Sequence, residues 1–526
     1  MVTGDREGKT ILERTCEWAA ALSLDDLPAS VVSKLRLQVA SVLSAAAAAP
    51  WHEPSRAVLR ARAAPGRTLV IATGDRRAPL DAAFVNAAFA MSLDMDDYML
   101  AGHTGYSAVL VPLAFARDLH TVLVAAAAAN ELMGRLSTSC LIGPVNGQIS
   151  TYIHDAGAAL ALGKVLGLTA DQLVSAVAIA LFQPNLCLAP GFWDQGAKTV
   201  TASQPMEHGV RAAQLAQAGL TGPRDIIEHP LGFATFFAFA RYPGLFDGLG
   251  RVWFSETLSY KRFPGTSYIS AAVEGALRCT DGVPMTSDEV GGVEVVTTLL
   301  SSGVDSVGAA AIERSPYDAN AINFSVRLSV ALALLQGDLT PDMLRPERLA
   351  EKEGEVRAIA RKVRVVHDWS QTLRLLDESP VGLAMLAHLT PGALARAASH
   401  IRMLGRASGA AGRNPVEIRG LLRDAPSLLR RLAAAKRRPV TALDFDPTTF
   451  HMLQSAHTTV RVRGEVRKAV IDVPVGACGR DPIETEGVVR WRLERSFGDR
   501  AGALWDVLGA PSTSVDDIYS IVDPSR

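Results

Sequence analysis

Apolar residues recur every three to four positions through most of the first half of the chain, and this spacing predicts helices. The first helix begins at a capping box, in which Thr10 is followed three residues later by Glu13, and it ends before Pro28. Further helices are expected at residues 31–50, 110–135, about 150–166, 170–182 and about 207–217. A short strand and turn at residues 68–75 is the one clear β signal in this half of the sequence.

The pattern becomes mixed after Ala271, so we place a domain boundary near residue 270. Alternating valines predict strands at residues 290–295 and 363–365, and residues 460–473 predict a hairpin that turns at Gly464. Between these strands, residues 324–335 predict a buried helix. Residues 378–448 are rich in Ala, Leu and Arg and are expected to form a helical insertion with a basic surface. Residues 482–497 predict a closing helix that packs back on the first half.

The composition narrows the possible partners. Hydrophobic residues make up 48% of the 526-residue chain and the formal net charge is −1, so charge gives no reason to expect a nucleic acid or an anionic membrane as partner. The five cysteines are far apart and include no CxxC pair, which is typical of buried thiols in a reducing compartment. The N-terminus lacks the apolar segment of a secretory signal, and charged residues interrupt the apolar run at 107–129. We therefore expect a soluble cytoplasmic protein.

One polar stretch, residues 91–112, stands out between apolar segments. It holds Asp94, Asp96 and Asp97, followed by His103 in a glycine-containing loop. On a helix, Asp94 and Asp97 would share one face, and their mutual repulsion would raise the pKa of one of them. Such an arrangement would make an acid/base site, beside a loop whose glycines allow close approach to a ligand. The alternative, of equal weight on these residues alone, is that the carboxylates cap a helix and His103 lies in a surface turn.

Four blocks of sequence, taken together, resemble the MmgE/PrpD family, which includes 2-methylcitrate dehydratase, cis-aconitate decarboxylase and iminodisuccinate epimerase. In family order they are NAAFAMSLDMDD at 86–97, AKTVTA with EHGVRAA and GLTGP within 197–223, YKRFP at 260–264, and IDVPVGACGRDPI at 471–483. The resemblance implies a mainly α fold with a large all-helical domain, residues 1–270 completed by residues 482–526. It implies a smaller α+β lid domain, residues 271–481 with the insertion at about 378–448. It also implies a homodimer and an active site between the domains, without metal or organic cofactor.

By position, the resemblance assigns Asp94, His103, Lys198 and Lys261 to the catalytic pocket. These residue types support the removal of a proton beside a carboxylate or carbonyl. His103 or the cluster at Asp94 can act as the base at neutral pH, and the two lysines can stabilise the resulting anion and bind a substrate carboxylate. Taken alone, each lysine would be assigned to the solvated surface. The resemblance reverses that assignment.

Three positions depart from the family pattern. Met91 stands where a histidine is usual, Tyr98 replaces a threonine, and Gln148 replaces a second catalytic histidine and cannot exchange protons near pH 7. Together with Asp97, these residues are predicted to contact the substrate. Met91 and Tyr98 suggest a less polar, bulkier substrate, such as a natural-product intermediate of secondary metabolism. His154, close in sequence to Gln148, is expected to be a structural helix residue.

Three functional interpretations stay open. The first is a lyase that removes an α-proton and expels water or carbon dioxide from a small molecule. The second keeps the proton abstraction but returns the proton or closes a ring, which gives an epimerase, isomerase or cyclase. The third is a non-catalytic scaffold that binds a partner through the arginines of residues 402–438, although a solvated face or subunit contact is the favoured interpretation of that segment. The sequence holds no nucleotide-binding fingerprint, HExxH, GxSxG or P-loop motif.

Overall fold

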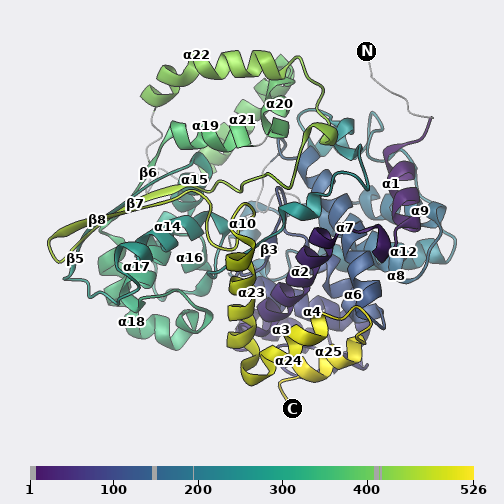
Figure 1. Ribbon diagram of the computed structural model, residues 1–526, viewed down its shortest axis with the longest axis horizontal. Coiled ribbons are helices and arrows are strands. Elements are labelled where there is room, and N and C mark those ends of the chain that lie inside the picture. Colours follow the sequence, from purple (N-terminus) through teal and green to yellow (C-terminus); the bar gives the residue numbers. More distant parts are fainter. Residues whose placement is uncertain (1–7, 145–150, 194, 379, 408–413, 415–417) are drawn as a thin grey trace.

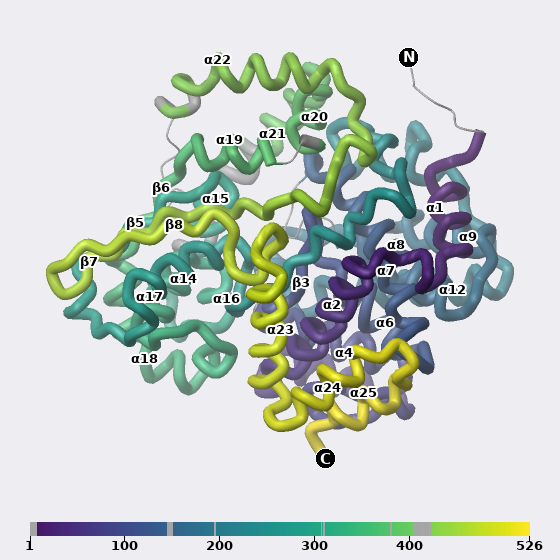
Figure 2. The backbone as a smooth tube through the Cα atoms, in the orientation of Figure 1, coloured from purple at the N-terminus to yellow at the C-terminus, as the bar shows by residue number. Residues whose placement is uncertain are grey.

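The structure, a computed structural model, describes the chain except for residues 1–7, 145–150, 194, 379, 408–413 and 415–417. Figure 1 shows a helical body that holds the N-terminal and C-terminal helices, and beside it a smaller part built around a sheet. The continuous tube in Figure 2 shows the chain passing from the helical body into the sheet-containing part and returning at its C-terminal end. The fold is mainly α, as the sequence predicted.

The helical body is assembled from the first half of the chain. Its longer helices are α1 (Ile11–Ala21), α2 (Ala29–Ala47), α3 (Glu53–Ala61), α4 (Pro79–Met91), α7 (Leu119–Ser139), α8 (Ile153–Val165), α9 (Ala170–Phe182) and α12 (Ser203–Gln217). The shorter ones are α5 (Gly105–Ala108), α6 (Leu110–Phe115), α10 (Ala189–Phe192), α11 (Gln195–Lys198) and α13 (Phe233–Phe237). The predicted capping box of Thr10 and Glu13 starts α1. The predicted short strand pairs as β1 (Thr68–Leu69) with β2 (Arg76–Arg77).

Two helix predictions in this body are corrected by the structure. The predicted helix at 110–135 is two helices, α6 and α7, because Asp118 accepts a hydrogen bond from the backbone N–H of Thr121 at 2.8 Å and caps α7. The helix predicted from Glu207 begins earlier, at Ser203. Pro205 is tolerated there because the first turn of a helix does not need its backbone N–H.

The smaller part contains a four-stranded mixed sheet in the order β6–β5–β7–β8. Strand β5 (Val290–Thr297) pairs in parallel with β6 (Val363–His367) and antiparallel with β7 (Ala456–Val462). Strands β7 and β8 (Glu465–Ile471) form the predicted hairpin. Val290, Val293 and Val295 are buried, which is the alternation that predicted β5. The helices of this part are α14 (Ser267–Cys279), α15 (Leu299–Gly308), α16 (Ala319–Asn323), α17 (Val326–Gln336) and α18 (Pro346–Ala360).

The predicted insertion is helical, and its described helices lie at the top of Figure 1. With the helix before it, they are α19 (Trp369–Glu378), α20 (Pro380–Ala387), α21 (Pro391–Ala407) and α22 (Ile418–Ala435). Val381 and Met385 of α20 join the hydrophobic core of the helical body, and Tyr242 Oη donates a hydrogen bond to the Met385 carbonyl at 2.8 Å. The insertion is therefore anchored to the helical body.

Two large hydrophobic cores organise the molecule, one in the helical body and one around the sheet. The C-terminal helices α23 (Pro482–Phe497), α24 (Ala501–Leu508) and α25 (Val515–Val522) add Val489, Leu493 and Leu504 to the first core. The predicted return of the closing helix to the first half is thereby confirmed. The division into domains at residues 270 and 481 stays a prediction. Within the described part of the chain, no helix is long and apolar enough to cross a membrane.

Candidate active site

The acidic stretch lies where the two cores meet. Leu93 and Met95 belong to the core around the sheet, whereas Tyr98, just beyond them, belongs to the core of the helical body. The chain crosses between the cores again near Lys261, because Tyr260 belongs to the first core and Phe263 to the second.

A pair of very short strands places these two crossings side by side. Strand β3 (Asp97–Tyr98) pairs antiparallel with β4 (Ser259–Tyr260), and Asp97 stands opposite Tyr260. The residue after β4 is Lys261, so its ammonium reaches the carboxylates that precede β3. Strands of two residues are too short to leave a periodic pattern, and the sequence therefore did not predict them.

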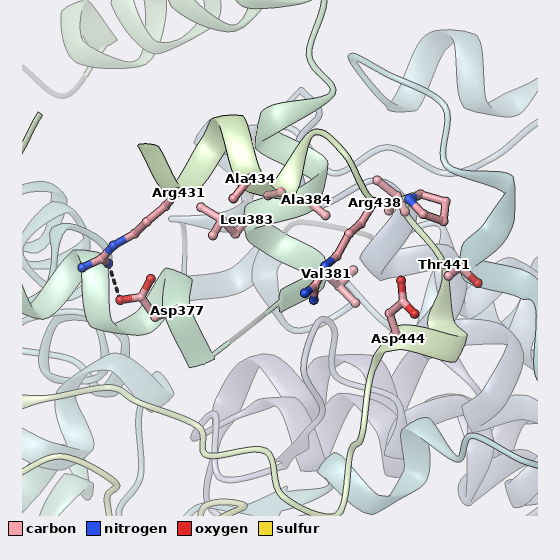
Figure 3. Close-up of a pocket in the computed structure, with 12 residues that line it drawn as sticks. Asp377, Val381, Leu383, Ala384, Arg431, Ala434, Arg438, Thr441 and Asp444 are labelled. Carbon is pink, nitrogen blue, oxygen red and sulfur yellow. Dashed lines mark hydrogen bonds and ion pairs between the residues drawn. The ribbon is translucent and has the colours of Figure 1, made fainter. Parts of the chain in front are cut away.

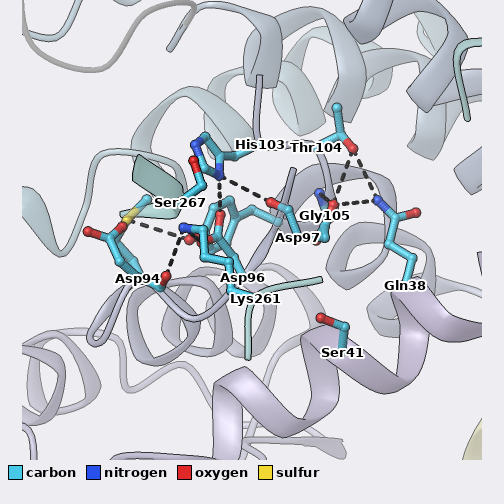
Figure 4. A network of polar contacts seen from close by, with 12 residues as sticks. Gln38, Ser41, Asp94, Asp96, Asp97, His103, Thr104, Gly105, Lys261 and Ser267 are labelled. Atoms are coloured by element: carbon cyan, nitrogen blue, oxygen red, sulfur yellow. Dashed lines mark hydrogen bonds and ion pairs between the residues drawn. The ribbon is translucent and has the colours of Figure 1, made fainter. Parts of the chain in front are cut away.

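Asp96 is the centre of a buried polar network (Figure 4). Its Oδ2 lies 2.6 Å from His103 Nδ1, and its Oδ1 accepts a hydrogen bond from Lys261 Nζ at 2.6 Å. Lys261 Nζ also donates to the backbone carbonyl of Asp94 at 2.8 Å. Burial by itself raises the pKa of Asp96, but the charges and hydrogen bonds of His103 and Lys261 outweigh burial and hold that pKa well below its usual range. Asp96 is therefore ionised at neutral pH and orients both partners.

The proton of a neutral His103 ring is fixed on Nδ1 by its surroundings. Nδ1 faces two acceptors, the Asp96 carboxylate and, at 3.1 Å, the Asp97 carbonyl. Nε2 then carries the lone pair. The His103 side chain is 24% exposed, so this lone pair is chemically able to accept a proton from a small molecule at the site.

Lys198 forms a buried ion pair with Asp94. The backbone of Asp94 is left-handed, with φ 51°, so this stretch is not helical. The prediction that Asp94 and Asp97 share a helical face is therefore wrong. Lys198 and Lys261 are 3% and 2% exposed, so neither is a solvated surface lysine. Burial lowers the pKa of Lys198, and the neighbouring Asp94 charge opposes that shift.

Asp97 points away from Asp94 and supports the loop that carries His103. Its Oδ2 accepts hydrogen bonds from Gln38 Nε2 at 2.8 Å and from the backbone N–H of Gly105 at 3.2 Å. A Cβ at Gly105 would overlap this carboxylate, which explains the glycine. Burial first, and then the charge of Asp96, raise the pKa of Asp97 to about 6. The pKa of one carboxyl group in the acidic stretch is thus raised, as the sequence predicted. The causes are burial and the charge of Asp96, whereas the prediction had named repulsion between Asp94 and Asp97. This placement favours a supporting role over the predicted substrate contact.

The substitution Asp97→Asn is expected to stabilise the protein at pH 8 more than at pH 5. Because the pKa of Asp97 is raised from 3.8 to about 6 in the folded state, the folded protein binds this proton more tightly, and stability falls as the pH rises through that range. Between pH 5 and pH 8 this shift corresponds to roughly 1–2 kcal/mol, and asparagine removes this pH dependence while keeping an acceptor for Gln38. Urea unfolding at both pH values measures the effect, with the exposed Asp499→Asn as control. An equal change at both pH values would contradict it.

Comparison with known proteins finds one matching family and several similar enzymes. Residues 13–243 match the MmgE/PrpD N-terminal domain family. The chain is 25% identical over 289 residues to cis-aconitate decarboxylase of Aspergillus terreus, which covers 50% of this chain and 59% of that relative. It is 23% identical over 384 residues to the cis-aconitate decarboxylase-like protein oryM of Aspergillus oryzae. That alignment covers 66% of this chain and 78% of the relative. It is 28% identical over 210 residues to cis-aconitate decarboxylase of Homo sapiens. That alignment covers 36% of this chain and 42% of the relative.

Residues 13–243 of the chain belong to the MmgE/PrpD N-terminal domain family. The resemblance inferred from the four sequence blocks is thereby confirmed. The alignments span less than two thirds of the Aspergillus terreus and human relatives.

Two of the three positions that depart from the family pattern, Met91 and Tyr98, lie within the part of the chain that the structure describes. Met91 is buried at the end of α4, where Tyr106 Oη donates to its Sδ at 3.6 Å. The Tyr98 ring centroid lies 6.2 Å from that of His103, so Tyr98 flanks the base. Gln148 lies outside the described residues. The assignment of catalytic and substrate-binding roles to these residues stays a prediction.

His154 occupies a buried place in the wall of this MmgE/PrpD site. Its Nδ1 lies 2.8 Å from Ser107 Oγ, and its ring meets that of Tyr106 edge-on with centroids 5.7 Å apart. Burial, followed by the charge of His103, lowers the pKa of His154 to about 3. The ring is therefore neutral at physiological pH, which supports the structural role expected from the sequence.

Arg492, on α23, is a member of the site that sequence reasoning missed. Its buried guanidinium donates to Ser41 Oγ at 2.8 Å and to the Lys261 carbonyl at 3.3 Å. Burial lowers its pKa to about 10, and the charges of Asp96 and Asp97 oppose that shift. A signal was available, because Arg492 follows Val488 by four residues and so occupies a position of the apolar stripe of its helix.

A cavity of about 340 Å³ lies in the insertion, away from this site (Figure 3). Val381 and Ala384 of α20 line it together with Arg431 and Arg438, and Arg431 is ion-paired with Asp377. None of the predicted catalytic residues lines it. Among the described residues, no group of three or more His, Cys, Asp or Glu side chains is arranged to hold a metal ion.

Proposed function

We propose that this chain is a cofactor-independent lyase, which removes a proton alpha to a carboxylate or carbonyl of a small molecule and eliminates water or carbon dioxide. The observation that carries the proposal is the Asp96 bridge, in which one buried carboxylate orients His103 on one side and Lys261 on the other. The relatives named as cis-aconitate decarboxylases support a lyase. We also propose that the enzyme acts as a cytoplasmic homodimer, as the family resemblance implies.

In the dehydration we propose, Lys198 and Lys261 hold the substrate carboxylate or carbonyl. An ammonium has three N–H donors, and the described residues give Lys198 one hydrogen-bond partner, Asp94. His103 Nε2 takes the α-proton, and the electron pair of the C–H bond moves into the carbonyl group as an enolate that the two cations stabilise. The enolate expels a β-hydroxyl group, which leaves as water after accepting the proton from the His103 imidazolium. His103 returns to its neutral form.

A decarboxylation would use the same groups. The electrons of the C–C bond stay on carbon as carbon dioxide leaves. His103, which has first taken up a proton from solvent, delivers that proton to the carbon and returns to its neutral form. An epimerase, isomerase or cyclase would share the first proton removal but leave the mass of the substrate unchanged. Mass spectrometry therefore separates elimination from the alternatives.

The substitution Lys198→Met is expected to lower turnover by about 100-fold or more, because it removes a buried cation that stabilises the anionic intermediate. A mass-spectrometric screen of small carboxylic acids for loss of water or carbon dioxide measures this. Lys436→Met, at an exposed lysine of the insertion, is the matched control and should leave turnover unchanged. Turnover that survives Lys198→Met would overturn the proposal, as would a protein that turns over no acid but binds a macromolecular partner equally well before and after the substitution.

A further inference from the structure

Two aromatic rings lie beside the ammonium of Lys198, and a third packs against both of them. Its Nζ lies 4.5 Å from the centroid of the Phe324 ring and 5.9 Å from that of Phe192. The ring of Trp193 contacts both, with centroid distances of 4.8 Å to Phe324 and 5.3 Å to Phe192. Phe192 and Phe324 are themselves 5.4 Å apart. Aromatic residues make up 6% of the chain, so three rings at one lysine are a notable concentration.

These rings come from distant parts of the chain. Phe192 ends α10 in the helical body, and Phe324 lies between α16 and α17. Asn320 Nδ2 donates to the carbonyl of Trp193 at 3.0 Å and ties the two segments together. The two phenylalanines are buried, Trp193 is half-buried, and the residue directly before Lys198, Ala197, is exposed. Lys198 is therefore bordered both by aromatic carbon and by a backbone segment that reaches the surface.

The charges of the described site argue against a substrate with several negative charges. Asp94 neutralises Lys198, and Asp96 neutralises Lys261. Arg492 lies behind them and donates to Ser41 and to a backbone carbonyl, not toward the rings. The described part of the site thus holds no surplus of cations for a polyanion. Each additional carboxylate buried without a partner would carry a large desolvation penalty.

We propose that the substrate is a monocarboxylate that bears an aromatic or other flat apolar group, and that Phe192, Trp193 and Phe324 bind this group beside Lys198. The proposal rests on the lyase function proposed above, because it takes Lys198 as the site of the substrate carboxylate. Edge-to-face contact with an aromatic ring strengthens binding by about two- to tenfold for each ring pair. The preference should therefore depend on these rings.

Three acids test the proposal with the full-length protein. They are β-hydroxy-β-phenylpropanoate, β-hydroxybutyrate, which replaces the phenyl group by a methyl group, and citrate, which carries three carboxylates. Isothermal titration calorimetry should show the phenyl acid binding at least about tenfold more tightly than either of the others. Tighter binding of citrate, or no binding of the phenyl acid, would overturn the proposal.

Two substitutions remove one ring each while keeping an apolar side chain. Phe324→Leu and Trp193→Leu should each weaken binding of the phenyl acid by about two- to tenfold and leave that of β-hydroxybutyrate unchanged. Because Trp193 is half-buried, its replacement perturbs folding less than replacement of Phe324. Phe445→Leu, in a separate aromatic cluster with Phe254 and Phe450, is the control. Unchanged phenyl preference in both site variants would contradict the proposal.

The results that would overturn the aromatic specificity differ from those that would overturn the lyase function. If the protein turns over citrate but not the phenyl acid, the lyase function stands and the aromatic specificity is wrong. If the phenyl acid binds with the expected ring dependence but neither reacts nor exchanges its α-proton, the aromatic site stands and the lyase function is wrong.

Discussion

Replacement of His103 by glutamine is expected to lower kcat/KM by about 100- to 10,000-fold, the usual contribution of a general base. Nδ1 of His103 faces the Asp96 carboxylate at 2.6 Å, which leaves Nε2 as the proton acceptor. Glutamine keeps a polar side chain of similar reach, but its amide cannot accept the proton. Steady-state kinetics on any acid found to react measures the loss.

The matched control for this prediction is His120→Gln. His120 is exposed at the start of α7 and is not part of the Asp96 network. Its replacement should leave kcat/KM unchanged. A His103 variant that keeps more than about a tenth of wild-type kcat/KM would show that another group removes the proton.

The substitution Lys261→Met is expected to lower the free energy of unfolding by about 3–5 kcal/mol, because it leaves a buried carboxylate without its cation. Lys261 Nζ is bonded to Asp96 Oδ1 at 2.6 Å and to the Asp94 carbonyl at 2.8 Å, and methionine replaces neither hydrogen bond. Urea unfolding followed by circular dichroism measures the change. Lys362→Met, which removes hydrogen bonds to the Ser287 and Val290 carbonyls at the surface, should cost about 1 kcal/mol.

A second substitution shows whether the stability lost in Lys261→Met is due to the unpaired charge of Asp96. In the Lys261→Met background, Asp96→Asn removes the orphaned carboxylate and should recover part of the lost stability. If the double variant is less stable than Lys261→Met by the full cost of Asp96→Asn alone, the two residues do not interact and the network in Figure 4 is not what stabilises this region.

The spacing of apolar residues predicted the helices and strands that pack against a core through one apolar face. The helix at 170–182, the hairpin at Gly464 and the return of residues 482–497 to the first core all follow from apolar spacing, and the structure has them. The same reasoning failed at Asp94, because a left-handed residue breaks a helix without any change in the apolar pattern. It also joined α6 and α7, because the apolar spacing resumes directly after the break at Asp118, the residue that caps α7.

The candidate site was harder to derive, because its contacts link residues far apart in the chain. Lys198 and Asp94 are separated by 104 positions, and Lys261 and Asp96 by 165. No local pattern selects one lysine from many, so the lysines came from family resemblance. Asp96, the centre of the network, was noted in the acidic stretch but not chosen, because its role depends on the β3–β4 pairing. The rings around Lys198 likewise meet only in three dimensions.

The central claim is that His103, oriented by Asp96, removes a proton alpha to a carboxylate or carbonyl. Its most direct test is incorporation of deuterium from heavy water at the α-carbon of a bound acid, followed by NMR. We predict that the wild-type protein incorporates deuterium and that His103→Gln does so at least about 100-fold more slowly. Incorporation at the same rate in both proteins, or in neither, would contradict the claim.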